Sequence, residues 1–250
     1  MGSEMCIRDR AYGVGEDIAD MVLDNRHRLL YLLDRQNRLV QRFNAVNQTL
    51  TDRIPLSLTD QPTYLGISVD GSTLYVSDPA NQQLLQIDAR TGVLHQSRSS
   101  SNQPGKLYPF ENQQQSYLAI LYPRDQQLQV LSAQTLTPLY SVNAGIEPYD
   151  LIYTDQDQAL FVSDMFSQQL LKIDPLTGQT LLVISTVVTP GLLAKDPINH
   201  NLLVGLCRDQ AVAFLPFGQQ LIARQTIVDG CPEDIAIARR RRLLFVALKD

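Results

Sequence analysis

The chain has 250 residues, of which 44% are hydrophobic and 19% are charged, and its formal net charge is −5. This is enough chain to bury a sizeable core in one large domain or two smaller ones. The mild negative charge argues against a nucleic-acid partner, because phosphate binding depends on basic surface, and no apolar run approaches the length of a membrane span.

The first ten residues fit no pattern found downstream. They lack the apolar stretch of a secretory signal, and we expect residues 1–10 to be a non-native leader that contributes nothing to the fold. Residues 11–250 are then expected to form one domain. Since the native N-terminus is expected to lie outside this sequence, the missing signal says little about the compartment.

A repeat of 42 to 44 residues runs along the rest of the chain. Its first marker is a proline, which recurs at spacings of 42, 44, 42 and 42 residues at Pro62, Pro104, Pro148, Pro190 and Pro232. Its second marker is a short apolar strand, centred at Tyr31, Tyr75, Leu118, Phe161, Leu203 and Phe245. Two independent markers with one period over six copies indicate a repeat protein.

The copy that begins at Pro148 shows the order of elements within one repeat. Residues 149–154, 160–163, 169–173 and 181–187 are predicted to be four short strands, because apolar, β-branched and aromatic residues are bounded there by turn residues. The segments 155–158, 164–167 and 174–178 are predicted to be turns. The repeats fall near residues 18–60, 61–102, 103–146, 147–188, 189–230 and, in part, 231–250.

Four short antiparallel strands in each period predict the blade of a β-propeller. One such sheet is too small to be stable alone, so neighbouring sheets must stack and bury both faces. The sequence therefore predicts an all-β propeller with about five and a half blades, and we expect it to be a fragment of a six- to eight-bladed ring. An incomplete last blade would leave residues 244–248 as an open edge strand.

The repeat also resembles known propeller families. The pattern P-x-D-L-I-x-x-D, followed by L-F-V-S-D, Q-L-L-K-I-D and T-G, is clearest between Pro148 and Gly178 and resembles the NHL and YVTN repeats. A similar stretch runs from Pro62 to Gly92, and a looser resemblance covers residues 18–250. The resemblance implies a propeller fold and, because YVTN proteins are often exported, an extracytoplasmic location, either periplasmic or secreted.

Three aspartates recur directly after the second strand of a repeat, at Asp34, Asp78 and Asp164. Calcium would need several oxygens that converge on one point, whereas these residues stand in separate blades. Each begins a tight turn of D-x-x-N or D-x-x-S form. We therefore interpret them as turn residues whose carboxylates accept backbone N–H groups. Blade three departs from the pattern with Leu121.

A second recurring set lies two positions after the repeat-opening proline, where the first strand of a blade is expected to line the central channel. Its polar members are Asp20, Tyr64, Lys106, Asp150 and Asp234. Mostly small residues follow two positions later, which suits a crowded axis and places the polar set at the channel mouth. We predict these five residues to be candidates for binding a ligand or cation, because clustered titratable groups mark sites. A hydrated mouth without a ligand, or aspartates paired with nearby backbone, is the alternative.

Two cysteines and a basic run complete the candidates. Cys207 follows a second strand and Cys231 precedes the next first strand, so both are expected on one face of the ring, one blade apart. A disulfide is possible if their Cα atoms lie within about 7 Å, and it would indicate a location outside the cytoplasm. Two separate thiols are the alternative.

The last copy of the repeat also contains a basic run. We interpret residues 239–242, four arginines, as a solvated loop, because the equivalent loops are acidic.

The sequence carries no familiar catalytic motif. It predicts a non-enzymatic binding or scaffold propeller, without a cofactor, that holds a protein partner or a small-molecule ligand on one face or at the channel mouth. The alternative is a metal-dependent hydrolase of the gluconolactonase-like propeller type, which residues 66–78 resemble. That resemblance implies calcium or another divalent cation held by Glu, Asn and Asp side chains. Tyr64, however, stands where an Asn would be expected, and after the expected leader, Glu16 is the one early Glu.

Overall fold

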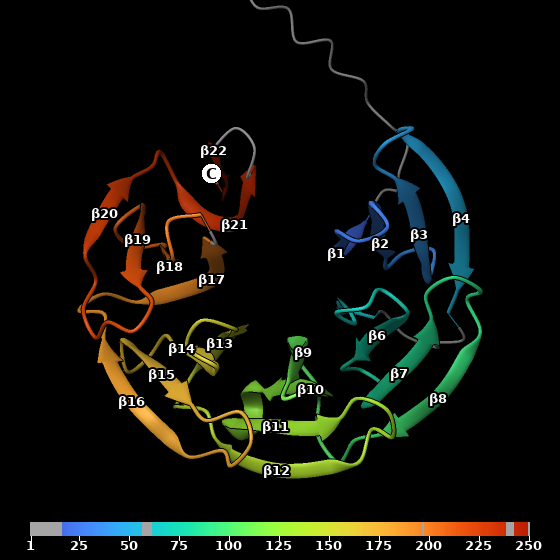
Figure 1. Ribbon diagram of the computed structural model, residues 1–250, viewed down its shortest axis with the longest axis horizontal. Coiled ribbons are helices and arrows are strands. Elements are labelled where there is room, and N and C mark those ends of the chain that lie inside the picture. Colours follow the sequence, from blue (N-terminus) through green and yellow to red (C-terminus); the bar gives the residue numbers. More distant parts are fainter. Residues whose placement is uncertain (1–16, 57–61, 197, 239–242, 250) are drawn as a thin grey trace, which may run out of the picture.

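The protein is described here from a computed structural model that covers residues 17–56, 62–196, 198–238 and 243–249. These residues form five four-stranded antiparallel sheets and one two-stranded sheet, arranged around a common axis (Figure 1). The predicted all-β propeller of four-stranded blades is confirmed. The expected leader at 1–10 and the arginine run at 239–242 lie outside the described residues.

Each blade consists of consecutive strands, so the chain completes one sheet before it starts the next. Blade one contains β1 (Ile18–Asp24), β2 (Leu29–Asp34), β3 (Leu39–Asn44) and β4 (Thr49–Pro55), and blade two contains β5 (Tyr64–Ile67), β6 (Thr73–Asp78), β7 (Gln83–Asp88) and β8 (Leu94–Ser99). Blade three contains β9 (Leu107–Asn112), β10 (Gln115–Tyr122), β11 (Gln127–Ser132) and β12 (Pro138–Asn143), with a short 3-10 turn, η1 (Pro123–Asp125), between β10 and β11.

The remaining blades follow the same order. Blade four contains β13 (Pro148–Thr154), β14 (Ala159–Asp164), β15 (Gln169–Ile173) and β16 (Thr180–Ser185), and blade five contains β17 (Pro190–Asp196), β18 (Asn201–Leu206), β19 (Ala211–Pro216) and β20 (Arg224–Ile227). The two-stranded sheet, blade six, contains β21 (Cys231–Ala238) and β22 (Leu243–Lys249). No helix in the described part of the chain is long and apolar enough to cross a membrane.

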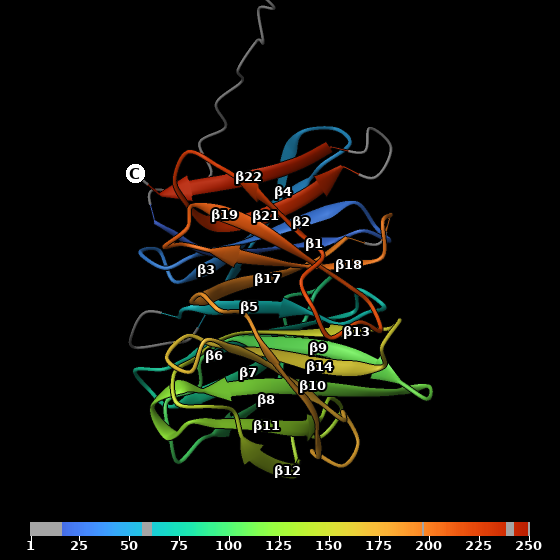
Figure 2. The ribbon, with the colours of Figure 1, turned by 90° about the vertical axis from the view of Figure 1, so that its left-hand side faces the viewer.

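The inner strands run along the direction of the axis, whereas the outer strands β4, β8, β12 and β16 lie along the circumference (Figures 1 and 2). The turns between strands lie at two opposite rims of the molecule. In blade four, Pro148 at the start of β13 pairs with Asp164 at the end of β14, which places both on one rim. Ile173 at the end of β15 pairs with Thr180 at the start of β16, which places the intervening turn on the other. We call the first of these the mouth rim.

The fourth strand of blade four is shorter than predicted. The sequence predicts a strand over 181–187, whereas β16 ends at Ser185. Val187 has a φ of +64°, in the left-handed region that an extended strand cannot use and that a β-branched residue rarely adopts. The β-branched residues Thr186, Val187 and Val188 continue past the end of the strand, which is why composition alone overextends it.

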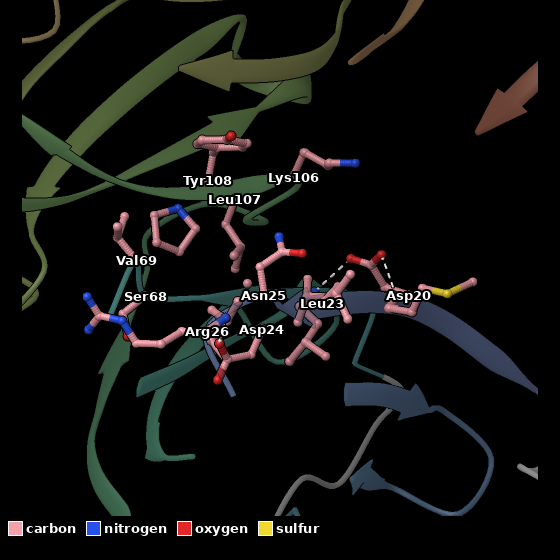
Figure 3. A pocket seen from close by; sticks show the side chains of 16 residues that line it. Asp20, Leu23, Asp24, Asn25, Arg26, Ser68, Val69, Lys106, Leu107 and Tyr108 are labelled. Atoms are coloured by element: carbon pink, nitrogen blue, oxygen red, sulfur yellow. Dashed lines mark hydrogen bonds between the residues drawn. The ribbon is translucent and has the colours of Figure 1, made fainter. Parts of the chain in front are cut away.

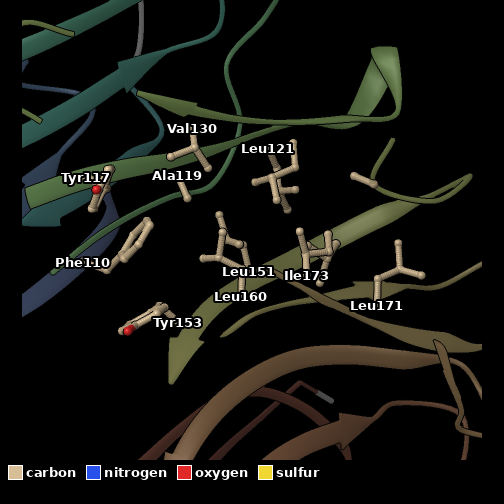
Figure 4. Close-up of a cluster of buried hydrophobic side chains, with 13 residues drawn as sticks. Phe110, Tyr117, Ala119, Leu121, Val130, Leu151, Tyr153, Leu160, Leu171 and Ile173 are labelled. Atoms are coloured by element: carbon tan, nitrogen blue, oxygen red, sulfur yellow. The ribbon is translucent and has the colours of Figure 1, made fainter. Parts of the chain in front are cut away.

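Neighbouring blades bury their facing sides against each other. Between blades three and four, Phe110, Ala119, Leu121 and Val130 pack against a set from the next sheet that includes Leu151, Tyr153, Leu160 and Ile173 (Figure 4). Side chains that alternate along one strand belong to different interfaces, since Leu151 lies in this cluster and Ile152 in the next one. Blades two to five are therefore each buried on both faces by their two neighbours, while blades one and six each pack against one neighbour in the described structure.

Tyrosines of the second strands add polar ties across these interfaces. The hydroxyl of Tyr31 in blade one donates to the carbonyl of Ala89 in blade two at 3.3 Å. The hydroxyl of Tyr75 in blade two donates to the carbonyl of Ala133 in blade three at 3.1 Å. Burial raises the pKa of Tyr75 to about 12, so its phenol remains a neutral donor at physiological pH.

We expect Phe161→Ala to lower the free energy of unfolding by about 3–5 kcal/mol, because the ring is buried in the cluster between blades four and five and its removal leaves a cavity. Asp155→Ala, at an exposed turn of the same blade, should cost far less. Chemical denaturation followed by circular dichroism measures both. Equal losses would contradict the described packing.

Candidate functional site

The first strands bring the predicted mouth residues to one rim of the molecule. Asp20, Asp150 and Asp234 lie near the starts of β1, β13 and β21, and Lys106 immediately precedes β9. The Nζ atom of Lys106 lies 3.5 Å from Oδ1 of Asp150, with 37% of the lysine side chain exposed and 7% of the aspartate side chain. The ion pair is therefore accessible from its lysine side.

A cavity of about 480 Å³ opens beside this ion pair, along the inner strands of blades one to three. Its lining includes Asp20, Lys106 and Tyr108, together with Arg26 and Ser68. Figure 3 shows Asp20 and Lys106 at one end of the cavity and Arg26 and Ser68 at the other. Asp20 and Lys106 therefore face a space large enough for a small ligand or a side chain of a partner.

The two best-buried carboxylates of the mouth also join neighbouring blades. Asp150 accepts the backbone N–H of Leu193 in blade five at 2.8 Å, and its other oxygen accepts the N–H of Leu151 at 2.7 Å. Asp20 does the same with Leu65 in blade two, at 2.8 Å, and with Met21. The sequence places these side chains toward the channel, but the carboxylates turn toward the next blade, because the faces of each sheet lie against its neighbours.

In the part of the chain that the structure describes, Asp234 makes only one of these two types of hydrogen bond, the one within its own strand. Its Oδ1 accepts the N–H of Ile235 at 2.8 Å, as Asp20 and Asp150 do with the residue that follows each of them. Within the described residues no following blade offers it a second backbone donor, and it is exposed. Asp234 is thus positioned like the other two aspartates but is held less firmly.

The charges of the mouth act on one another. The carboxylate of Asp150 raises the pKa of Lys106, and Asp20 adds to this effect. Burial raises the pKa of Asp20, although Lys106 and the two backbone N–H donors oppose the rise. Burial likewise raises the pKa of Tyr64, opposed by Lys106 and supported by Tyr149. Residues from blades one to four therefore form one electrostatic cluster, and Leu192 takes the equivalent position in blade five.

The aspartates after the second strands make hydrogen bonds within turns. Asp34 accepts the backbone N–H and the side-chain amide of Asn37, and Asp78 makes the same pair of bonds with Asn81. Asp164 accepts the backbone N–H groups of Ile146 and Glu147. Burial opposes ionisation of Asp34, but these donors outweigh it and lower its pKa. Among the described residues no group of three His, Cys, Asp or Glu side chains could hold a metal ion.

Cys207 and Cys231 form a disulfide, with their Cα atoms 4.2 Å apart. The bond joins the residue after β18 to the first residue of β21, so it ties blade six to blade five. Blade six also packs through Ile235 and Val246 on Leu203 and Phe214. A two-stranded sheet buries little surface of its own, so this covalent tie holds the least supported sheet of the described fold.

Sequence reasoning missed two residues that contact the inner strands. Ser163, at the end of β14, accepts the N–H of Asp150 at 3.0 Å and so orients its backbone. Lys195 lies over the ring of Tyr108 at 5.6 Å and 3.8 Å from Asp155. The bond from Asp150 to Leu193 had a sequence signal, because its separation of 43 residues equals one repeat. The contact between Lys195 and Tyr108 could not be inferred from the repeat spacing.

No protein-family model matches the chain, and no curated protein is significantly similar to it. Among solved structures the chain is similar to "Dihydro-heme d1 dehydrogenase NirN in complex with DHE", with a TM-score of 0.68 and 14% sequence identity. The likeness covers 91% of this chain and 50% of the NirN chain, so this chain spans half the length of that protein. At this identity the likeness shows the β-propeller fold alone.

We expect Asp150→Ala to lower the free energy of unfolding by about 3 kcal/mol, because it leaves two buried N–H groups and Lys106 without their acceptor. Asp234→Ala is the matched control, since one local bond is lost at an exposed position, and it should cost less than about 1 kcal/mol. Urea denaturation of both variants measures the difference. Similar losses would show that the Asp150–Leu193 bond does not join the blades.

Reduction of the disulfide should loosen blade six selectively. The bond closes a loop with a sequence separation of 24 residues, for which the loss on reduction is about 3 kcal/mol. We expect amide hydrogen exchange in β21 and β22 to accelerate after reduction, while exchange in β10 and β11 stays unchanged. Uniform acceleration across all sheets would instead indicate that the bond supports the whole ring.

Proposed function

We propose that this chain is a non-enzymatic binding module that holds a protein partner or a small ligand at the channel mouth. The observation that carries this proposal is the accessible Lys106–Asp150 ion pair, with Asp20 beside it, at the end of a cavity of about 480 Å³. The aspartates are fixed by bonds to two blades each, so the charges are held in place before any ligand arrives. Pre-positioned charge of this kind favours binding.

The charge of the mouth favours a cationic group on the ligand. Asp20, Asp150 and Asp234 supply three carboxylates against the single ammonium of Lys106, which leaves two negative charges. Each carboxylate oxygen has two acceptor sites, so an oxygen that already accepts one backbone N–H can still accept a donor from a ligand. A guanidinium or ammonium group fits this requirement because it supplies several donors.

The disulfide supports a location outside the cytoplasm. Disulfides persist in oxidising compartments and are rare where thiol reductants are abundant. We infer that the protein works in the periplasm or is secreted, where Cys207 and Cys231 stay paired. The partner or ligand would then be found in that compartment.

The test uses nuclear magnetic resonance of the labelled protein with two simple probes, N-acetyl-arginine amide and N-acetyl-aspartate amide. We expect the arginine probe to shift the amide signals of Leu65, Leu193 and Ile235, which are the backbone donors to the three carboxylates. Asp20→Asn should weaken this response. Absence of these shifts with both probes, or a stronger response to the aspartate probe, would contradict the proposed site.

A calcium titration separates this proposal from the metal-dependent hydrolase. We expect calcium or zinc to leave the melting temperature unchanged, because the mouth carboxylates already accept backbone N–H groups and point toward different blades. A rise in melting temperature that Asp150→Ala abolishes would instead favour the hydrolase. Asp234→Ala serves as the control for general loss of charge.

A further inference from the structure

Four large apolar side chains stand exposed on the mouth rim of blade four. Ile146 is 50% exposed, Tyr149 53%, Phe166 68% and Val187 80%. We call these four residues the blade-four patch. Tyr149 is the second residue of β13, and the other three lie in loops: Ile146 in the connection before β13, Phe166 in the β14–β15 turn and Val187 in the connection after β16.

Backbone hydrogen bonds hold these three loops side by side. The N–H of Met165 donates to the carbonyl of Glu147, and the N–H of Ile146 donates to Asp164. The N–H of Thr186 donates to the carbonyl of Gln168. The patch is therefore held in a defined position by hydrogen bonds between the loops that carry it.

The other blades show that the fold does not require these side chains. Phe166 stands where blades one, two, three and five have Gln36, Ala80, Pro123 and Arg208. Tyr149 stands where the other five blades have Ala19, Thr63, Gly105, Gly191 and Glu233. The same turns form with small or polar residues, so packing within the blade does not explain the apolar ones.

Val187 adds a second, independent sign of function. Its counterparts three residues before the repeat proline are Ser101, Gly145 and Asp229, and Gly145 also has a positive φ, of +101°. Valine at a φ of +64° is strained, whereas glycine at this position would not be. Backbone strain of this kind is concentrated at functional sites.

The patch is continuous with the mouth. Tyr149 directly precedes Asp150, and its ring lies 3.9 Å from where a Cβ would stand on Gly191 of blade five. A partner that covers the patch would thus lie next to the Lys106–Asp150 ion pair of the mouth. Apolar side chains beside fixed charge are typical of protein interfaces, which combine an apolar centre with a polar rim.

We propose that the blade-four patch and the channel mouth together bind a protein partner through a segment that presents apolar side chains next to an arginine or lysine. This inference rests on the proposed function and specifies its partner. The apolar side chains would cover Phe166, Tyr149 and Val187. The basic side chain would reach the acidic mouth, where charge complementarity selects it over an acidic one.

Two pools of short labelled peptides test this. Both vary Leu, Ile, Phe and Tyr at alternate positions, and they differ in one central residue, Arg in one pool and Glu in the other. We expect fluorescence polarisation to detect binding of the Arg pool and not of the Glu pool. Phe166→Ser should weaken the best Arg peptide by about tenfold, the loss typical of a residue at the centre of an interface.

The control variant is Leu176→Ser, in the β15–β16 turn on the opposite rim of the same blade, where Leu176 is 39% exposed. It should leave the affinity unchanged. Val187→Gly should weaken binding while raising the melting temperature, because glycine relieves the strained backbone. This opposite movement of affinity and stability separates loss of contact from loss of fold.

Several results would overturn the inference: no binding by either pool, equal binding of both, or equal weakening by Phe166→Ser and Leu176→Ser. The amide signals of Leu65 and Leu193 report binding at the mouth. They therefore distinguish failure of the patch proposal from failure of the proposed function. If the Arg peptide shifts these signals but ignores Phe166→Ser, the mouth binds and the patch does not. If it depends on Phe166 and leaves these signals unmoved, the proposed function at the mouth fails.

Discussion

The structure depends on the packing of neighbouring small sheets face to face, which buries both faces of blades two to five. A four-stranded blade cannot remove enough apolar surface from water alone, and each interface supplies what the sheet lacks. Leu151 and Ile152, adjacent in β13, pack into different interfaces, so one strand serves two contacts. Hydrogen bonds between blades add to this packing. Each links a blade to the one that follows it in the sequence, as Asp150 does with Leu193 and Tyr31 does with Ala89.

The fold was predictable because two independent sequence markers show the same repeat period of 42 to 44 residues. Repeat prolines and apolar second strands fix the blade boundaries, and turn residues such as Asp164 and Gly178 fix the hairpins. The end of β16 was not predictable, because β-branched residues continue to Val187 and the reversal there is a backbone property. At Gly178 the reverse holds, since its φ of +76° and the nearness of Val142 and Tyr140 require glycine and the sequence shows it.

The mouth was predictable in its membership and not in its geometry. Equal spacing from the repeat proline identified Asp20, Lys106 and Asp150 as one set. The sequence could not show that the carboxylates turn toward the next blade, because alternation along a strand does not say which face meets the axis. The blade-four patch was hidden for another reason: Phe166 falls in a predicted turn and Tyr149 in a predicted strand, and the sequence does not show that both side chains are exposed on the same rim.

The hydrogen bonds between successive blades have a consequence for how such a ring can change over time. Each donor and acceptor pair spans one repeat, with separations of 45 residues for Asp20 and Leu65 and 43 for Asp150 and Leu193. Each repeat carries the acceptor carboxylate for the next blade and the donor N–H for the preceding blade. Duplication or deletion of a whole repeat would therefore restore this hydrogen bond between the blades that become neighbours. Blade number can drift in this architecture without new contacts being invented, and a specialised surface on one blade can be inherited unchanged.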